Sequence, residues 1–156
     1  MCKVNSPYRP SQCRCISFSF DRLQLLLAML RSKQKLFKSN YDVFLNVVGG
    51  MNVVDNAADL PVVMSLISSI KNTCLPSYTC FFGEIGLTGE LRPIPYIDER
   101  IKLASYLGFK QCYIPYYDSS VILKNDERFD RKNEVYQDLQ IFRNKNIQDV
   151  IDSVFA

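Results

Sequence analysis

The stretch FFGEIGLTGELRPIPYIDERI, Phe81 to Ile101, places three glycines and two prolines between an apolar run and a charged helix start. The segment TCFFGEI predicts a strand, GLTGEL a turn whose glycines permit positive φ, and RPI a short return strand. A helix that ends at Gly108 and the strand QCYIP follow. The buried face of that helix is predicted to contain Ile97, Ile101, Ala104 and Leu107.

The segments on both sides add further helices and strands. In DRLQLLLAMLRSKQKLF the leucines recur at helical spacing, and YDVFLNVV is a strand that enters a turn at Gly49 and Gly50. MNVV predicts a short strand, and Asn56 or Asp59 can cap the next helix, with Pro61 in its first turn. LQIF predicts a final strand, and IQDVIDSVF predicts a final helix capped by Asn146. The order of elements predicts an α+β fold in which a mixed sheet is layered with helices.

The chain has 156 residues, which suits one domain. Residues 1–15 contain two prolines and are predicted to be a linker or N-terminal arm, with the domain proper at 16–156. Residues 117–138 are polar and charged with little periodicity, which predicts a long, mobile loop. No apolar run approaches the roughly 20 residues of a membrane helix, and no signal peptide is expected.

The chain contains no histidine, so a Ser-His-Asp or Cys-His nucleophile cannot be built from it. Its cysteines lack the spacing of a zinc site, and we expect no metal site. Buried, reduced thiols are the favoured interpretation, which fits a reducing compartment such as a bacterial cytoplasm or an organellar matrix or stroma. The six cysteines are at positions 2, 13, 15, 74, 80 and 112.

The net charge of +3 hides an asymmetry, because residues 1–40 hold eight basic side chains against the single acid Asp21. Basic clusters suit an anionic partner such as a nucleic-acid backbone, although a solvated helix face gives the same pattern. The residues predicted to contact DNA phosphates are Arg14, Arg22, Arg31, Lys33, Lys35 and Lys38.

Together, DVFLNVVGGMNVVDNAADLPVVMSLISS and the stretch from FGEIGLTGE to the LGF helix end resemble the C-terminal domain of the bacterial RadA (Sms) family. That domain is itself similar to the proteolytic domain of Lon. The resemblance runs from about Arg9 to Pro115 and implies a Lon-protease-like layered fold. Beyond Pro115 it is loose.

In Lon, a serine at the entry of one helix and a lysine at the start of the next form the catalytic dyad, which needs no histidine. By the resemblance, the serine position falls on Ala58 and the lysine position on Asp98. Both groups are absent, so the resemblance implies a catalytically inactive domain. The alternative is a Lon-type serine peptidase with a displaced dyad, for which Ser65 and Lys102 are the nearest substitutes.

The resemblance also implies a function. The expected domain is a non-catalytic oligomerisation and DNA-contacting scaffold of a RadA-type DNA-dependent ATPase, acting in branch migration, homologous recombination and DNA repair. Its expected partners are single-stranded or branched DNA, copies of itself in a six-membered ring, and a RecA-type recombinase. Charges that could pair across a subunit boundary are Glu84, Glu90 and Arg92.

No cofactor is expected in this chain. It has no G-x-x-x-x-G-K-[ST] phosphate loop and no zinc-binding quartet of cysteines. ATP, magnesium and zinc would belong to parts of a full-length RadA that this sequence lacks.

Overall fold

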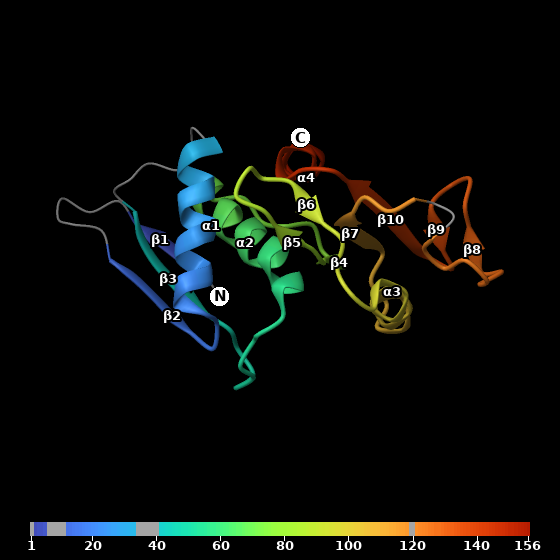
Figure 1. Ribbon diagram of the computed structural model, residues 1–156, viewed down its shortest axis with the longest axis horizontal. Coiled ribbons are helices and arrows are strands. Elements are labelled where there is room, and N and C mark those ends of the chain that lie inside the picture. The colour runs from blue at the N-terminus through green and yellow to red at the C-terminus, as the bar shows by residue number, and fades with distance from the viewer. Residues whose placement is uncertain (1, 6–11, 34–40, 119–120) are drawn as a thin grey trace.

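The computed structural model describes residues 12–33, 41–118 and 121–156, together with the backbone of residues 2–5. A three-stranded sheet occupies one end of the molecule and a five-stranded sheet the other, with helix α2 between them (Figure 1). The fold is therefore a mixture of sheet and packed helices, and the predicted α+β class is confirmed.

The three-stranded sheet has the order β1-β3-β2. Strand β1 (Cys2–Asn5) runs antiparallel to β3 (Asp42–Asn46), and β2 (Cys13–Ile16) runs parallel to it. Helix α1 (Phe20–Lys33) lies across this sheet (Figure 1). Its leucines at helical spacing are all buried, because they face the sheet and α2: Leu23, Leu26, Leu27 and Leu30.

The short helix η1 (Asn56–Ala58) leads into α2 (Asp59–Lys71), the central helix of the larger core. Pro61 lies in the first turn, where an amide would have no intrahelical acceptor. Asn72 ends the helix in the left-handed conformation. The hairpin of β5 (Glu84–Ile85) and β6 (Leu91–Arg92) then lies beside α2.

The five-stranded sheet has the order β4-β7-β10-β9-β8. Its parallel part contains β4 (Thr79–Phe81), β7 (Gln111–Pro115) and β10 (Leu139–Asn144), and its antiparallel part contains β9 (Val135–Tyr136) and β8 (Phe129–Asp130). Helix α3 (Ile97–Tyr106) belongs to the second core, and α4 (Ile147–Val154) closes the chain with a capping box between Asn146 and Asp149.

Two expectations about irregular segments were wrong. Residues 2–5 and 13–15, expected within a linker or arm, belong to β1 and β2, because β3 supplies both strands with hydrogen-bonding partners. Residues 117–138, expected as a long, mobile loop, carry β8 and β9 and fill the second core. Their buried side chains are Ile122, Leu123, Phe129 and Tyr136.

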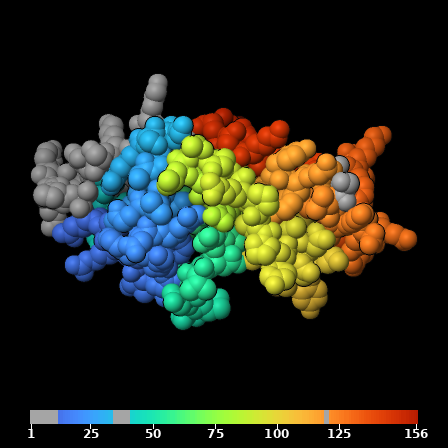
Figure 2. Space-filling model, in the orientation of Figure 1, coloured from blue at the N-terminus to red at the C-terminus, as the bar shows by residue number. Residues whose placement is uncertain are grey.

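Two smaller expectations also need correction. Leu107, expected on the buried face of α3, is 63% exposed, because α3 ends at Tyr106 and the chain turns away there. MNVV contributes only an isolated bridge between Val53 and Phe18. The segment after β3 projects from the surface, as the teal atoms in Figure 2 show. No helix in the described ranges is long and apolar enough to cross a bilayer.

Candidate functional site

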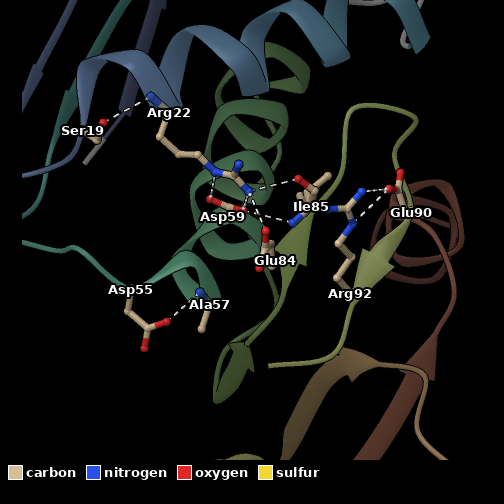
Figure 3. Close-up of polar contacts among 9 residues, drawn as sticks. All are labelled: Ser19, Arg22, Asp55, Ala57, Asp59, Glu84, Ile85, Glu90 and Arg92. Carbon is tan, nitrogen blue, oxygen red and sulfur yellow. Dashed lines mark hydrogen bonds and ion pairs between the residues drawn. The ribbon is translucent and has the colours of Figure 1, made fainter. Parts of the chain in front are cut away.

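Arg22, Asp59 and Ile85 connect α1, α2 and β5 (Figure 3). The Asp59 carboxylate is fully buried, pairs with Arg22 Nη2, and accepts hydrogen bonds from Arg22 Nε and the Ile85 amide, both at 3.0 Å. Nη2 also donates to the Ile85 carbonyl at 3.1 Å and lies 3.6 Å from Glu84 Oε1. The hydrogen bond with Asp59 raises the pKa of Arg22. Both charges are thus compensated, and three elements are joined.

Ala58, at the expected serine position, is the N-cap residue of α2 and lines a cavity of about 260 Å³. The charged groups in that cavity are Asp55 and Arg100, which form an ion pair. The Ala57 amide also donates to Asp55 at 2.9 Å, and this bond and the Arg100 pair lower the pKa of Asp55. No serine, threonine, cysteine or lysine is among the described residues that line the cavity. The cavity therefore holds neither the serine hydroxyl nor the lysine amine of a Lon-type dyad, and its carboxylate, Asp55, is paired with Arg100.

Asp98, at the expected lysine position, lies in the first turn of α3. Its Oδ1 accepts a hydrogen bond from the Leu123 amide at 2.9 Å. This contact ties α3 to the segment 117–138, and Asp98 does not line the cavity beside Ala58. The two positions of the expected dyad therefore have separate structural surroundings.

Ser65 and Lys102, the substitutes considered for a displaced dyad, are not brought together. Ser65 lines a separate depression on α2, and no lysine is among the described residues around it. Lys102 Nζ lies 3.4 Å from Asp126 Oδ2, and α2 and α3 lie apart in Figure 1. No observation therefore favours a second catalytic pair here.

The turn between β5 and β6 is closed by contacts around Glu90. Its carboxylate accepts hydrogen bonds from Thr88 and from Arg92 Nη2, the latter at 2.7 Å, and these lower the pKa of Glu90 to about 2. A Cβ on Gly86 would lie 1.9 Å from Glu90 Oε1, so glycine leaves the room that this carboxylate occupies. Glu84, Glu90 and Arg92 therefore all have partners within the chain, and their role at a subunit boundary stays a prediction.

The six residues predicted to contact DNA divide into three groups. Arg14, Arg31 and Lys33 are exposed on β2 and the last turns of α1. Arg22 is engaged with Asp59, so we leave it out of any DNA surface. Lys35 and Lys38 lie outside the described residues.

The cysteines of the described ranges are free thiols, and no group of three or more Cys, Asp or Glu side chains there has the arrangement of a metal site. Cys80 and Cys112 are buried and lie opposite each other on the neighbouring strands β4 and β7. Both had been predicted to lie in strands. The hydrogen bond with Cys80 and burial raise the pKa of Cys112 well above its ordinary value. Cys74 is exposed, contrary to the expectation of buried thiols.

Sequence reasoning missed several of these contacts. The Asp55–Arg100 pair joins residues 45 positions apart, and nothing in the local pattern of either residue indicates the other. Asp59 was expected only as a possible helix cap, whereas it is the buried partner of Arg22.

No protein-family model matches the chain. It is 44% identical over 108 residues to the DNA repair protein RadA of Aquifex aeolicus, an alignment that covers 69% of this chain and 24% of that protein. Identity to the DNA repair protein RadA of Haemophilus influenzae is 37% over 131 residues, covering 84% and 26%. For that of Escherichia coli it is 42% over 95 residues, covering 61% and 21%. The chain thus spans about a quarter of the length of these curated relatives.

Proposed function

The chain is a relative of the RadA proteins and matches their C-terminal part, and on this premise we propose that it is the non-catalytic, DNA-contacting and oligomerisation domain of a RadA-type DNA-dependent ATPase. Such a domain would act in DNA repair and in branch migration during homologous recombination. The relatives themselves carry the name DNA repair protein.

One observation carries the DNA-contacting part of the proposal. Arg14, Arg31 and Lys33 are exposed on neighbouring elements, and within the described part of the chain no carboxylate lies at ion-pair distance from any of them. Figure 2 shows β2 and α1, in blue, as one continuous surface. Three cations without acidic partners favour an anionic ligand, and phosphate contacts of this kind position DNA without reading its sequence.

The surroundings of Ala58 support the non-catalytic part. The cavity that would hold a Lon-type dyad is lined by an aspartate and an arginine already paired with each other. Asp98 is engaged with the Leu123 amide. In this proposal the Asp55–Arg100 and Asp98–Leu123 contacts have a structural role and join α3 to neighbouring segments. ATP, magnesium and zinc would be bound by other parts of a full-length RadA.

The assembly proposed is a ring of six copies that encloses or carries single-stranded or branched DNA, with a RecA-type recombinase as a further partner. Glu84, Glu90 and Arg92 would lie near the boundary between copies. We place this assembly in a bacterial cytoplasm or in an organellar matrix or stroma.

Sedimentation velocity of the purified chain with a fluorescent single-stranded oligonucleotide tests both parts at once. The proposal expects a boundary at about six times the chain mass that carries the label and releases it as salt rises. A monomer boundary beside free label at low salt would contradict both assembly and DNA contact by this chain.

A charge-reversal pair locates the contact. The double variant Arg31→Glu with Lys33→Glu should weaken binding and reduce the slope of log K against log salt by about 0.7 for each phosphate that is no longer neutralised. The matched control is Lys124→Glu with Lys132→Glu, which makes the same change in net charge at exposed lysines of the 117–138 segment. Equal effects from the two double variants would mean that only net charge matters.

A further inference from the structure

A groove of about 790 Å³ lies between β2, β3 and the start of α1. Strand β2 is an edge strand of the three-stranded sheet, and no other strand of the described residues pairs with its outer edge. Its walls include Arg14, Ile16, Phe20 and Phe44. The volume is that of sites which take compact organic ligands.

The apolar side chains of this groove are turned outward. Ile16 is 63% exposed, Phe20 49% and Phe44 36%. On β3 the neighbours Val43 and Leu45 point into the core, so the alternation of the strand turns Phe44 to the opposite face. Two exposed phenylalanine rings in one groove are not explained by core packing, and clustered exposed apolar groups mark a contact surface.

The charge around the groove is positive. Arg14 is the register partner of Phe44 on the neighbouring strand. Arg31, in the last turn of α1, is exposed but does not line the groove. The acid Asp21 follows Phe20 on α1 and is exposed, but it does not line the groove.

Exposed aromatic rings beside an arginine suit one class of nucleic acid in particular. Single-strand binding proteins combine a basic groove that follows the backbone with aromatic side chains on which bases stack, and every unpaired base offers such a face. In a duplex, those faces are already stacked on one another. An arginine beside the ring adds its own attraction to base and phosphate.

We propose that the groove between β2, β3 and α1 binds unpaired nucleotides of single-stranded DNA, with Phe20 and Phe44 stacking on bases and Arg14 holding a phosphate. This inference rests on the proposed function and names its substrate and site. It distinguishes the DNA preference of this surface from simple attraction between a cationic protein and any polyanion.

The test compares affinities for a fluorescein-labelled oligothymidylate and for a labelled duplex of equal length, measured by anisotropy at a salt concentration where both bind. The double variant Phe20→Leu with Phe44→Leu should bind the single strand about 5-fold or more weakly for each base no longer stacked, with duplex affinity changed less than about twofold. Its salt slope should match the unsubstituted chain, since every phosphate keeps its basic partner.

Two further variants separate stacking from folding. Phe20→Tyr with Phe44→Tyr keeps both aromatic faces and should retain single-strand affinity. Tyr106→Leu removes an aromatic ring that is 86% exposed on α3, away from the groove, and should have no effect. Thermal unfolding of every variant checks that the fold is kept, and the single variants Phe20→Leu and Phe44→Leu decide the question if the double variant fails to fold.

Each alternative outcome is distinct. If the leucine pair lowers affinity for both ligands equally, or for neither, while the unsubstituted chain binds DNA with salt dependence, the inference is wrong and the proposed function stands. If the unsubstituted chain binds no DNA, the DNA-contacting part of the proposed function fails and takes the inference with it. If the leucine pair dissolves an assembly of the chain without changing DNA affinity, the groove is a protein interface and the inference is wrong.

Discussion

The cavity beside Ala58 and the groove along β2 differ in how their charged residues are paired. In the cavity, Arg100 is paired with Asp55, and the nearby Arg22 is paired with Asp59. In the groove, Arg14 has no carboxylate partner among the described residues, and the side chains of Phe20 and Phe44 are exposed. One site is closed by contacts within the chain and the other is left open.

This difference predicts that substitutions at the two sites will affect different properties, namely stability at the cavity and ligand binding at the groove. Substitutions around the closed site remove partners from buried or half-buried groups, so they should lower the free energy of unfolding. Substitutions in the open groove remove few internal contacts, so they should change ligand affinity instead. The following predictions test that division, beginning with the largest expected effect.

Asp59→Ala should lower the free energy of unfolding by about 3 kcal/mol or more, because it leaves Arg22 and the Ile85 amide without their buried acceptor. Urea unfolding followed by far-ultraviolet circular dichroism measures the change. Asp59→Asn, which keeps an acceptor for the Ile85 amide, should be less damaging and replaces the alanine variant if that does not fold.

The control for this prediction is Glu84→Gln. Glu84 lies 3.6 Å from the same Arg22 nitrogen and its side chain is 27% exposed, so the loss should stay below about 1 kcal/mol. Equal losses in the free energy of unfolding from the Asp59 and Glu84 variants would show that burial of the Asp59 carboxylate does not strengthen its contribution.

Asp98→Ala should have the next largest effect. It removes the acceptor of the Leu123 amide, and Leu123 is 1% exposed, so the loss should be about 1 to 3 kcal/mol. Hydrogen exchange of the Leu123 amide should accelerate in parallel. Glu99→Ala, at the next and exposed position of α3, is the control; slow exchange retained in the Asp98 variant would mean that this bond does not hold the 117–138 segment.

The elements with strong local signals were predicted correctly, whereas those that depend on distant partners were not. The leucine spacing of α1 and the Asn146 cap of α4 are encoded within a single turn or two, so they can be read directly. Strand β2 depends on β3, which comes more than 25 residues later, and its four residues give no periodic signal by themselves. The buried residues of the 117–138 segment likewise show no periodic spacing, because charged residues lie between them.

The candidate site shows the same limit. Ala58 and Asp98 could be matched to the dyad positions by resemblance alone, because that comparison uses only the order of residues. The number of basic side chains could be read from the sequence, but the acidic partner of each one could not be predicted. Arg22 and Arg31 both belong to the basic N-terminal cluster, and the sequence does not distinguish them. Arg22 is a structural residue because α2 brings Asp59 next to it, whereas Arg31 is exposed.

Phe20→Leu should lower the free energy of unfolding by less than about 1 kcal/mol, since the ring is 49% exposed and leucine keeps most of the apolar contact. Urea unfolding, compared with the Asp59 series, tests the open side of the comparison. Phe81→Leu, where the ring is 7% exposed, serves as the buried counterpart and should cost more. A large loss from Phe20→Leu would mean that the groove wall is a structural part of the core.

The smallest expected effect concerns Glu90, in the hairpin that Asp59 anchors through Ile85. Its pKa is held at about 2, below the ordinary 4.5, first by Thr88 and then by Arg92. A lowered carboxyl pKa stabilises the fold above pH 4.5, and this contribution is lost as pH falls towards 2. Because the side chain is 38% exposed, solvent screens the pair and the stability change should be small. Carboxyl carbon chemical shifts against pH should give a midpoint near 2 that rises on Thr88→Ala and less on Arg92→Gln, whereas a midpoint at 4.5 in the unsubstituted chain would mean that these contacts are not kept in solution.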